Sequence, residues 1–355
     1  MKKHIYMAAI AALAIVSCSK DEIKDANNGQ AIDFRTMMTR AAEVTTAGLS
    51  DIWVTATSQS ETNYFTDLQF SRNSDYFKSE TSYYWPSDGS TLQFYAYSPG
   101  EESFTGDVNI DKTSQSVTGF TPAADITDQV DFIVATASGS KEDAKEGVGL
   151  VFDHALSQIE IKALSSNAGY VYKVAGVRIG KVISKGDFNF ASKGWSLSRE
   201  KADYEVLYNN APRTLTEDAQ TLMASENDNA MLIPQQLVAW NAESDKINED
   251  EGSYLAVLVN ISTSAGAQVF PQETEAYGWI ATPIDAKWDD GFKYVYTLDL
   301  KDGGIVAPDT PVDPDNPDDP FKPGDDVLAG KISFTSNMIS WTTANNGNSY
   351  SNIEM

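Results

Sequence analysis

The sequence predicts an all-β protein built from β-sandwiches. Apolar and polar residues alternate with a period of two in many short segments, and β-branched and aromatic residues fill them. Gly, Asn, Asp, Ser and Pro separate the segments, and strands at this spacing are typical of sandwiches. Long helix-period segments are lacking, and the best helical candidate, 217–226, is short. The expected strands include 52–57, 92–97, 148–152, 158–162, 254–259 and 293–298.

The length of the chain indicates two domains. Its 355 residues are too many for one ordinary domain. Stretches rich in Gly, Asn and Ser at 165–169 and 208–213 are possible breaks. We place the boundary near 165–175.

Charge and composition exclude several classes of function. The chain has 26 Lys and Arg residues against 51 Asp and Glu residues, a formal net charge of −25. Such an acidic excess argues against nucleic acid or an anionic membrane surface as a partner. One Cys and two His leave little for metal or acid–base chemistry. We therefore expect that the protein is not an enzyme and has no catalytic residue, metal or cofactor. We expect His154, which has core-type neighbours in the sequence, to be a hydrogen-bonded structural residue.

The N-terminus has the features of an export signal. Lys2 and Lys3 precede an apolar stretch, 5–16, that is too short to span a bilayer comfortably. Ser17 and Cys18 then resemble a bacterial lipoprotein processing site, and the acids that follow resemble the surface-export tag of Bacteroidetes lipoproteins. Lipidated Cys18 would tether the precursor to the outer membrane through its acyl chains. An ordinary signal peptide with an incidental Cys18 is the alternative.

A proline-rich segment follows the expected second domain. Prolines stand at 308, 311, 314, 317, 320 and 323, a strict spacing of three that matches the polyproline II repeat. Residues 308–323 could then span ~50 Å as a stiff spacer. Calcium binding at 313–316 is disfavoured, because this stretch lacks the glycine and the following Glu of a calcium loop. The apolar strand 332–341 on such an arm would reach another molecule, unless the segment folds back onto its own body.

Two strands at opposite ends of the chain are interchangeable in pattern. On one face, the first strand offers Ile32, Phe34, Thr36 and Met38. The last strand offers Ile332, Phe334, Ser336 and Met338. Because strand faces repeat every two residues, one groove could accept either strand.

A protease site lies between the first strand and the body. Arg40 is followed by the small residue Ala41 in a polar stretch, which suits an arginine-specific protease. Cleavage there would release 18–40 and leave an apolar groove, the kind of edge that recruits a strand in trans. In the alternative interpretation Arg40 is a solvated loop residue. Arg35 is a second, less attractive site because it lies within the strand.

These features together resemble the Bacteroidales fimbrillins, the major- and minor-fimbrillin-like subunits of type V pili. The resemblance rests on Cys18 with its acidic tag and on segments 32–34, 39–41, 94–99, 131–135, 150–159, 231–235 and 294–298. It implies two transthyretin-like β-sandwich domains, lipoprotein export, arginine-specific proteolysis and polymerisation by strand exchange with a C-terminal donor. Stalk subunits of this family need both a groove and a donor, and this chain has the pattern of both.

The sequence therefore predicts a fimbrial stalk subunit at the outer membrane and cell surface. Its expected partners are other copies of itself, related pilins and an arginine-specific protease. The alternative is a tip subunit or a non-polymerising surface lipoprotein adhesin that binds glycans or host protein. The expected parts are a signal peptide (1–17), a propeptide (18–40), two sandwiches (41–168 and 169–302), an extended linker (303–330) and a donor strand (331–355).

Overall fold

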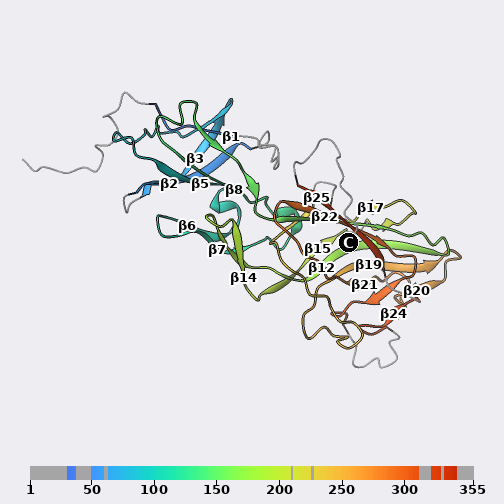
Figure 1. The fold of residues 1–355 in the computed structure, drawn as a ribbon. Helices are drawn as coiled ribbons and strands as arrows, with labels where there is room; N and C mark the ends of the chain where they lie inside the picture. Colours follow the sequence, from blue (N-terminus) through green and yellow to red (C-terminus); the bar gives the residue numbers. More distant parts are fainter. Residues whose placement is uncertain are drawn as a thin grey trace, which may run out of the picture.

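The chain folds into an elongated all-β molecule with two lobes, as Figure 1 shows. The computed structural model describes residues 30–36, 49–59, 63–208, 211–224, 228–311, 321–328 and 332–341. Within these ranges the helical elements are two 3₁₀ turns, η2 (Glu101–Ser103) and η3 (Ile126–Asp128). The prediction of an all-β fold is confirmed.

One eight-stranded sheet forms the first lobe. Apolar residues alternate along its strands, so that Leu92, Phe94 and Ala96 face a core that also contains Phe70. The order of the strands is β10 (Asp153–His154), β8 (Ile133–Gly139), β5 (Leu92–Ser98), β2 (Asp51–Thr57), β3 (Asn63–Asn73), β4 (Tyr76–Lys78), β1 (Phe34–Thr36) and β9 (Val148–Leu150).

The second lobe is a sandwich of two sheets. Ile159 and Tyr296 from one sheet meet Val257 and Ile280 from the other in a single apolar core. The first sheet contains β17 (Gln220–Thr221), β11 (Ser157–Leu164), β22 (Phe292–Asp299), β25 (Ser333–Ser340) and, on β11, β18 (Ala230–Leu232). The second contains β15 (Lys201–Leu207), β12 (Tyr170–Ile183), β19 (Tyr254–Thr263), β21 (Gly278–Pro283), β23 (Gly304–Val306) and β24 (Asp326–Val327), with β16 (Arg213–Thr214) on β12 and β20 (Gln268–Phe270) on β19.

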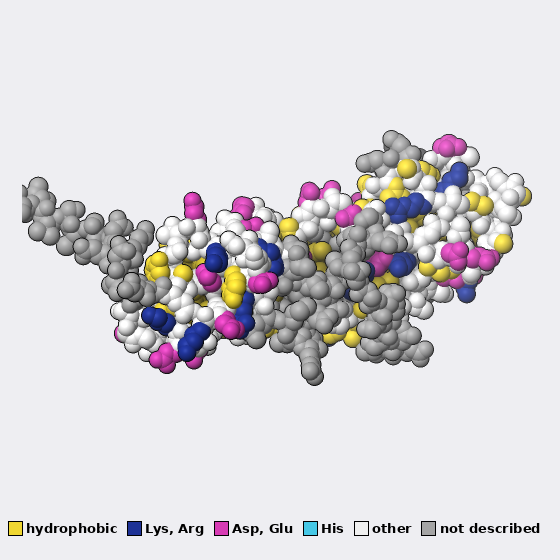
Figure 2. Space-filling view, turned by 90° about the horizontal axis from the view of Figure 1, so that it is seen from above, with side chains coloured by type: hydrophobic (Ala, Val, Ile, Leu, Met, Phe, Trp, Pro, Cys, Tyr) yellow, Lys and Arg dark blue, Asp and Glu magenta, His cyan; other side chains and the backbone are white. Residues whose placement is uncertain are grey.

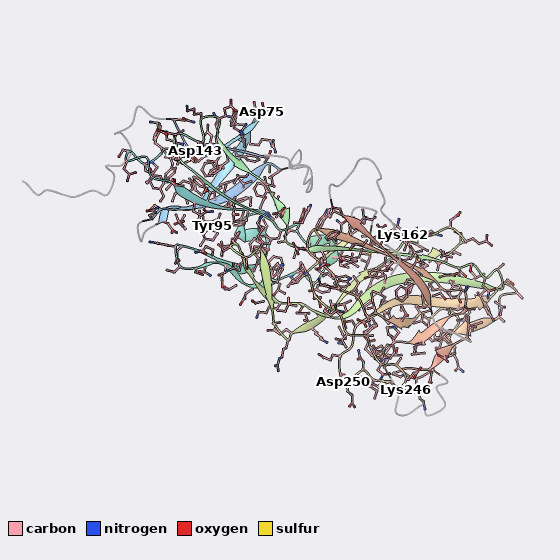
Figure 3. The ribbon with its side chains drawn as sticks, in the orientation of Figure 1. Asp75, Tyr95, Asp143, Lys162, Lys246 and Asp250 are labelled. Atoms are coloured by element: carbon pink, nitrogen blue, oxygen red, sulfur yellow. The ribbon has the colours of Figure 1, made fainter. Side chains whose placement is uncertain are left out.

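A fourth sheet joins strands from both halves of the sequence. Its order is β14 (Gly194–Leu197), β13 (Gly186–Asn189), β7 (Gln115–Thr121) and β6 (Thr105–Ile110). We call it the shared sheet. Phe188 on β13 lies 5.8 Å, ring to ring, from Phe132 and 5.2 Å from Trp195. Tyr95 reaches the same cluster from the first lobe, with its ring 6.3 Å from Phe190 (Figure 3). The hairpin β13–β14 therefore packs the second half of the chain against the first.

Strand pairing crosses the boundary that the sequence suggests. β11 ends before residue 168 but pairs in parallel with β22, deep in the second half. The division into two domains at 168/169 stays a prediction, because β11 pairs with a strand from beyond that boundary.

The best helical candidate of the sequence, 217–226, is not helical in the part that the structure describes. Residues 217–218 form a bend, and Gln220 and Thr221 form β17, which pairs with β11. Thr221 lies opposite Lys162 and Gln220 opposite Ala163. Pairing to an existing strand edge has overridden the helix propensity of this short segment.

The described ranges contain no helix with the length and apolar character needed to cross a membrane.

The first prediction concerns the shared sheet. Phe188 is 1% exposed, so Phe188→Ala should lower the free energy of unfolding by about 3–5 kcal/mol through lost burial and a residual cavity. Urea denaturation would measure this change. Leu197→Ala in the same hairpin is the control, because Leu197 is 38% exposed and should change stability by less than about 1 kcal/mol. Equal effects of the two substitutions would contradict a structural role for the cluster.

Candidate functional site

The first strand fills a slot in the first sheet. β1 pairs in parallel with β9, with Phe34 opposite Val148, and antiparallel with β4, with Phe34 opposite Phe77. The amide of Ile32 donates to the carbonyl of Tyr83 at 2.7 Å. The backbone of β1 is therefore bonded on both sides, as that of a central strand would be.

Phe34 anchors this strand in the core. Its side chain is fully buried, with its ring 4.8 Å from that of Phe70 and 5.2 Å from that of Phe94, both edge to face. Ile32 is 1% exposed and belongs to the same core. Removing β1 would leave a groove between β4 and β9 with aromatic side chains at its floor.

A glycine lets the chain run close beside β1. Gly147, just before β9, has φ +84°, and a Cβ there would lie 3.1 Å from the carbonyl oxygen of Asp33. The amide of Val148 then donates to that same oxygen at 2.8 Å. The wall of the groove on the β9 side thus depends on a residue without a side chain.

Charged residues line the outer rim of the groove. Asp33 faces outward and lies 3.6 Å from the ammonium of Lys78 on β4. Arg35 lies 3.4 Å from the carboxylate of Glu146, in the turn before β9. Figure 3 labels Asp75 and Asp143, from the β3–β4 turn and the turn before β9, in the outer part of the first lobe.

The last strand lies on the second lobe, in a different sheet from β1. β25 pairs antiparallel with β22 over its whole length, from Ser333 opposite Asp299 to Ser340 opposite Phe292. It is the edge strand of that sheet, so one side of its backbone has no neighbouring strand among the described residues. Phe334 is 38% exposed and its ring lies 6.2 Å from that of Tyr296. Burial raises the pKa of the Tyr296 hydroxyl, which stays neutral beneath this strand.

A stacked aromatic pair ends β25. The indole of Trp341 lies 3.7 Å from the His154 ring at an interplanar angle of 10°, and both side chains are buried. Nδ1 of His154 lies 2.8 Å from Oδ1 of Asp131, so the prediction of a hydrogen-bonded structural histidine is confirmed. The amide of Trp341 donates to the carbonyl of Gly291 at 2.8 Å, beside a cavity of about 190 Å³ that Asp290 and Lys193 also line. The tail is therefore held at the junction of the two halves.

The described flanks of the proline-rich segment lie on the second lobe, and the extended spacer itself stays a prediction. On its first flank, β23 pairs with β21, and Asp309 forms an ion pair with the buried guanidinium of Arg178. On its second flank, Phe321 packs edge to face on Phe270 at 4.9 Å, and β24 pairs with β23. Both flanks thus fold back onto the second lobe, and the stretch 312–320, with the calcium candidate 313–316, lies outside the described residues.

The structure separates the predicted site residues into three groups. Ile32 and Phe34 are buried and Thr36 is half-buried in the slot. In the last strand Ile332 is buried, Phe334 is exposed, and Ser336 and Met338 are half-buried. Cys18, Met38, Arg40 and Ala41 lie outside the described residues.

Sequence reasoning missed two features of the site. The rim pairs of Asp33 and Arg35 and the stack of Trp341 on His154 join residues more than 40 positions apart. Asp33 and Arg35, which flank Phe34 in the sequence, could have indicated that the outward face of the strand forms ion pairs. No local pattern indicates which residue Trp341 contacts.

No metal-binding arrangement stands out where the structure is described. Among the described residues, no group of three or more His, Cys, Asp or Glu side chains is placed to hold one ion. On the face seen in Figure 2, acidic and basic side chains lie interspersed among polar surface with small apolar patches.

The fold and the two terminal strands define a class of bilobed all-β proteins whose first strand completes a sheet and whose last strand lies at an edge. A family model described as fimbrillin-like matches residues 39–314. The chain therefore belongs to the fimbrillin-like family.

The chain is also similar to solved structures, and the first of them has the same fold. A fimbrial protein from Bacteroides vulgatus is 16% identical, with 88% of this chain and 99% of that chain covered at a TM-score of 0.59. A candidate cell adhesion protein from Bacteroides ovatus is 13% identical, with coverages of 90% and 100% and a TM-score of 0.48. The fimbrial anchor protein Mfa2 from Porphyromonas gingivalis is 9% identical, with coverages of 76% and 90% and a TM-score of 0.33. A comparison with curated proteins finds no match.

The second prediction compares the two phenylalanines of the terminal strands. Phe34→Ala should lower the free energy of unfolding by about 3–5 kcal/mol, because a fully buried ring is lost from the first core. Phe334→Ala should cost less, about 1–2 kcal/mol, because that ring is 38% exposed and loses only part of the burial free energy of a core phenylalanine. Urea titration of the two full-length variants would test this ranking, and a larger loss for Phe334→Ala would refute it.

The third prediction concerns the end of β25. Trp341→Ala removes the stack on His154, so the amides of β25 should exchange with solvent faster while those of β19 keep their protection. Hydrogen–deuterium exchange read by mass spectrometry would measure both. Thr335→Ala, at an exposed position of the same strand, is the control. Unchanged exchange in β25 of the Trp341 variant would show that the strand is held by its pairing to β22 alone.

Proposed function

We propose that this member of the fimbrillin-like family is a stalk subunit of a surface fimbrium that polymerises by strand exchange. In this proposal the precursor is exported as a lipoprotein through Cys18, and an arginine-specific protease cleaves after Arg40. The propeptide 18–40, which carries β1, then leaves, and the tail of a neighbouring copy or a related pilin enters the groove between β4 and β9. The subunit acts by assembly rather than by catalysis.

One contrast carries the proposal. Phe34 is fully buried in the slot, whereas Phe334, its match in the last strand, is 38% exposed on its own lobe. Full burial of an exposed Phe side chain stabilises by about 1.5–3 kcal/mol, so burying the exposed 38% of Phe334 would stabilise by about 0.5–1 kcal/mol. At the position of Phe334 the tail thus has more to bury in the groove of another subunit than in its own seat, and the groove has no occupant once β1 is cut away.

The position of the tail supports exchange between molecules. β1 and β25 lie in different lobes, and the tail strand is already at a sheet edge (Figure 1). An edge strand can leave by breaking pairing on one side only. The flanks of the proline-rich segment, held by Arg178 and Phe270, would stay with the donor subunit.

The alternative is a tip subunit or a monomeric adhesin that does not polymerise. The observation that favours it is the retention of β25 on its own lobe, with Trp341 seated at the junction. In that case β1 either stays in place or is replaced by a donor, and the tail has no acceptor.

The fourth prediction tests these two functions. Purified precursor starting at residue 19 is treated with an arginine-specific protease and run unboiled on an SDS gel. A ladder of SDS-resistant oligomers should form. It should be absent for Arg40→Ala and for a chain ending at Gly330, and it should persist for Arg35→Lys, which removes the second possible cleavage site.

The outcomes separate the candidates. A ladder that requires both Arg40 and the tail supports the stalk subunit. Cleavage at Arg40 that leaves only monomer, with and without the tail, would refute it and favour the alternative. Mass spectrometry of the mature N-terminus would place the cut, with Ala41 as the expected first residue.

A further inference from the structure

The outward face of the first strand forms ion pairs with both neighbouring walls of the slot. Asp33 lies directly across from Lys78 in the β1–β4 pair, because Phe34 is opposite Phe77. On the other side of the strand, Arg35 meets Glu146 beside β9. The groove thus has a basic residue on one wall and an acidic residue on the other, each paired to a charge on β1.

The tail of this chain is neutral at both positions. If Phe334 takes the place of Phe34, strand periodicity puts Ser333 where Asp33 was and Thr335 where Arg35 was. Neither hydroxyl can form an ion pair. After exchange with its own tail, the groove would keep its aromatic floor but lose both rim pairs.

The two rim residues are exposed and belong to the groove, so they remain after cleavage. The side chain of Lys78 is 49% exposed and that of Glu146 is 77% exposed. Asp33 and Arg35 are the ion-pair partners found for them in the described part of the chain, and cleavage after Arg40 would remove both partners together. Complementary rim charges act mainly on specificity and rate, since exposed pairs are individually weak.

Resting on the strand exchange proposed above, we propose that Lys78 and Glu146 select the donor strand. They favour a donor from a different subunit that carries an acid at the place of Asp33 and a base at the place of Arg35. This charge-matched donor is preferred over the neutral tail of a second copy. The groove would then mark a junction between unlike subunits, and its own tail would be the weaker partner.

Synthetic donor strands test this selection directly. Three peptides covering 331–341 would be used: the native sequence, the matched double variant Ser333→Asp with Thr335→Arg, and the reversed double variant Ser333→Arg with Thr335→Asp. All three carry the same net charge, so only the pattern differs. Each is fluorescently labelled and present in excess while the full-length precursor is cleaved, with the chain's own tail as internal competitor.

The matched peptide should be taken up best. Two exposed ion pairs correspond to about a 2- to 25-fold advantage over the native peptide, and the reversed peptide should fall below the native one. The differences should shrink in 1 M salt, where charges are screened within about 3 Å. Incorporated label and the shortening of the ladder measure the same preference in two ways.

A charge-swapped groove supplies the matched control. Lys78→Glu with Glu146→Lys should reverse the ranking, so that the reversed peptide is taken up best. Equal uptake of the three peptides by the native groove, in a protein that still forms a ladder, would overturn the selection while leaving strand exchange intact. Absence of both ladder and uptake would overturn strand exchange and the selection with it.

Discussion

The burial of Phe34 between β4 and β9 is the contact on which the first lobe depends. β9 follows β1 by more than one hundred residues and runs parallel to it. β1 therefore joins β9 to β4, a connection that a hairpin between neighbouring strands in sequence could not make. Its ring completes an aromatic core with Phe70 and Phe94. Any segment that replaces β1 must therefore supply two rows of backbone hydrogen bonds and one large apolar side chain at the right register.

The two terminal strands have the same pattern but opposite surroundings. β1 is bonded on both sides and has its apolar face sealed, while β25 is bonded on one side and leaves Phe334 partly in solvent. This difference in burial favours exchange into the slot, because a phenylalanine buried there contributes more to stability than one partly exposed at the sheet edge. Trp341 opposes the exchange, because its stacking on His154 stabilises the tail on its own subunit.

Much of the fold follows from the sequence because strands leave a local signature. Alternation at 92–97 and 254–259 predicts β5 and β19, and both are present, with β19 buried on both faces. The best helical candidate, 217–226, contributes a strand instead, because pairing with β11 is a long-range contact that local propensity does not encode. The proline repeat predicts local backbone shape but cannot reveal that Arg178 would hold Asp309 onto the second lobe.

The candidate site divides in the same way. Ile32 and Phe34 could be assigned to a buried face from the period of two alone, and they are buried. The walls of their slot could not, because β4 and β9 lie about 40 and 110 residues away in sequence and only the folded sheet brings them together. Lys78 and Glu146 belong to those walls, so their ion pairs with Asp33 and Arg35 could not be predicted from the sequence either.

The shared sheet has a mechanical consequence. Because β13 and β14 from the second half complete a sheet with β6 and β7 from the first, the two lobes cannot pivot about a simple linker. Phe132, Phe188 and Trp195 fill the interior of this joint, and close-packed interiors resist deformation. In a fibre of such subunits each molecule would act as one stiff rod. Bending under the drag of flowing liquid would then be confined to the points where one rod meets the next.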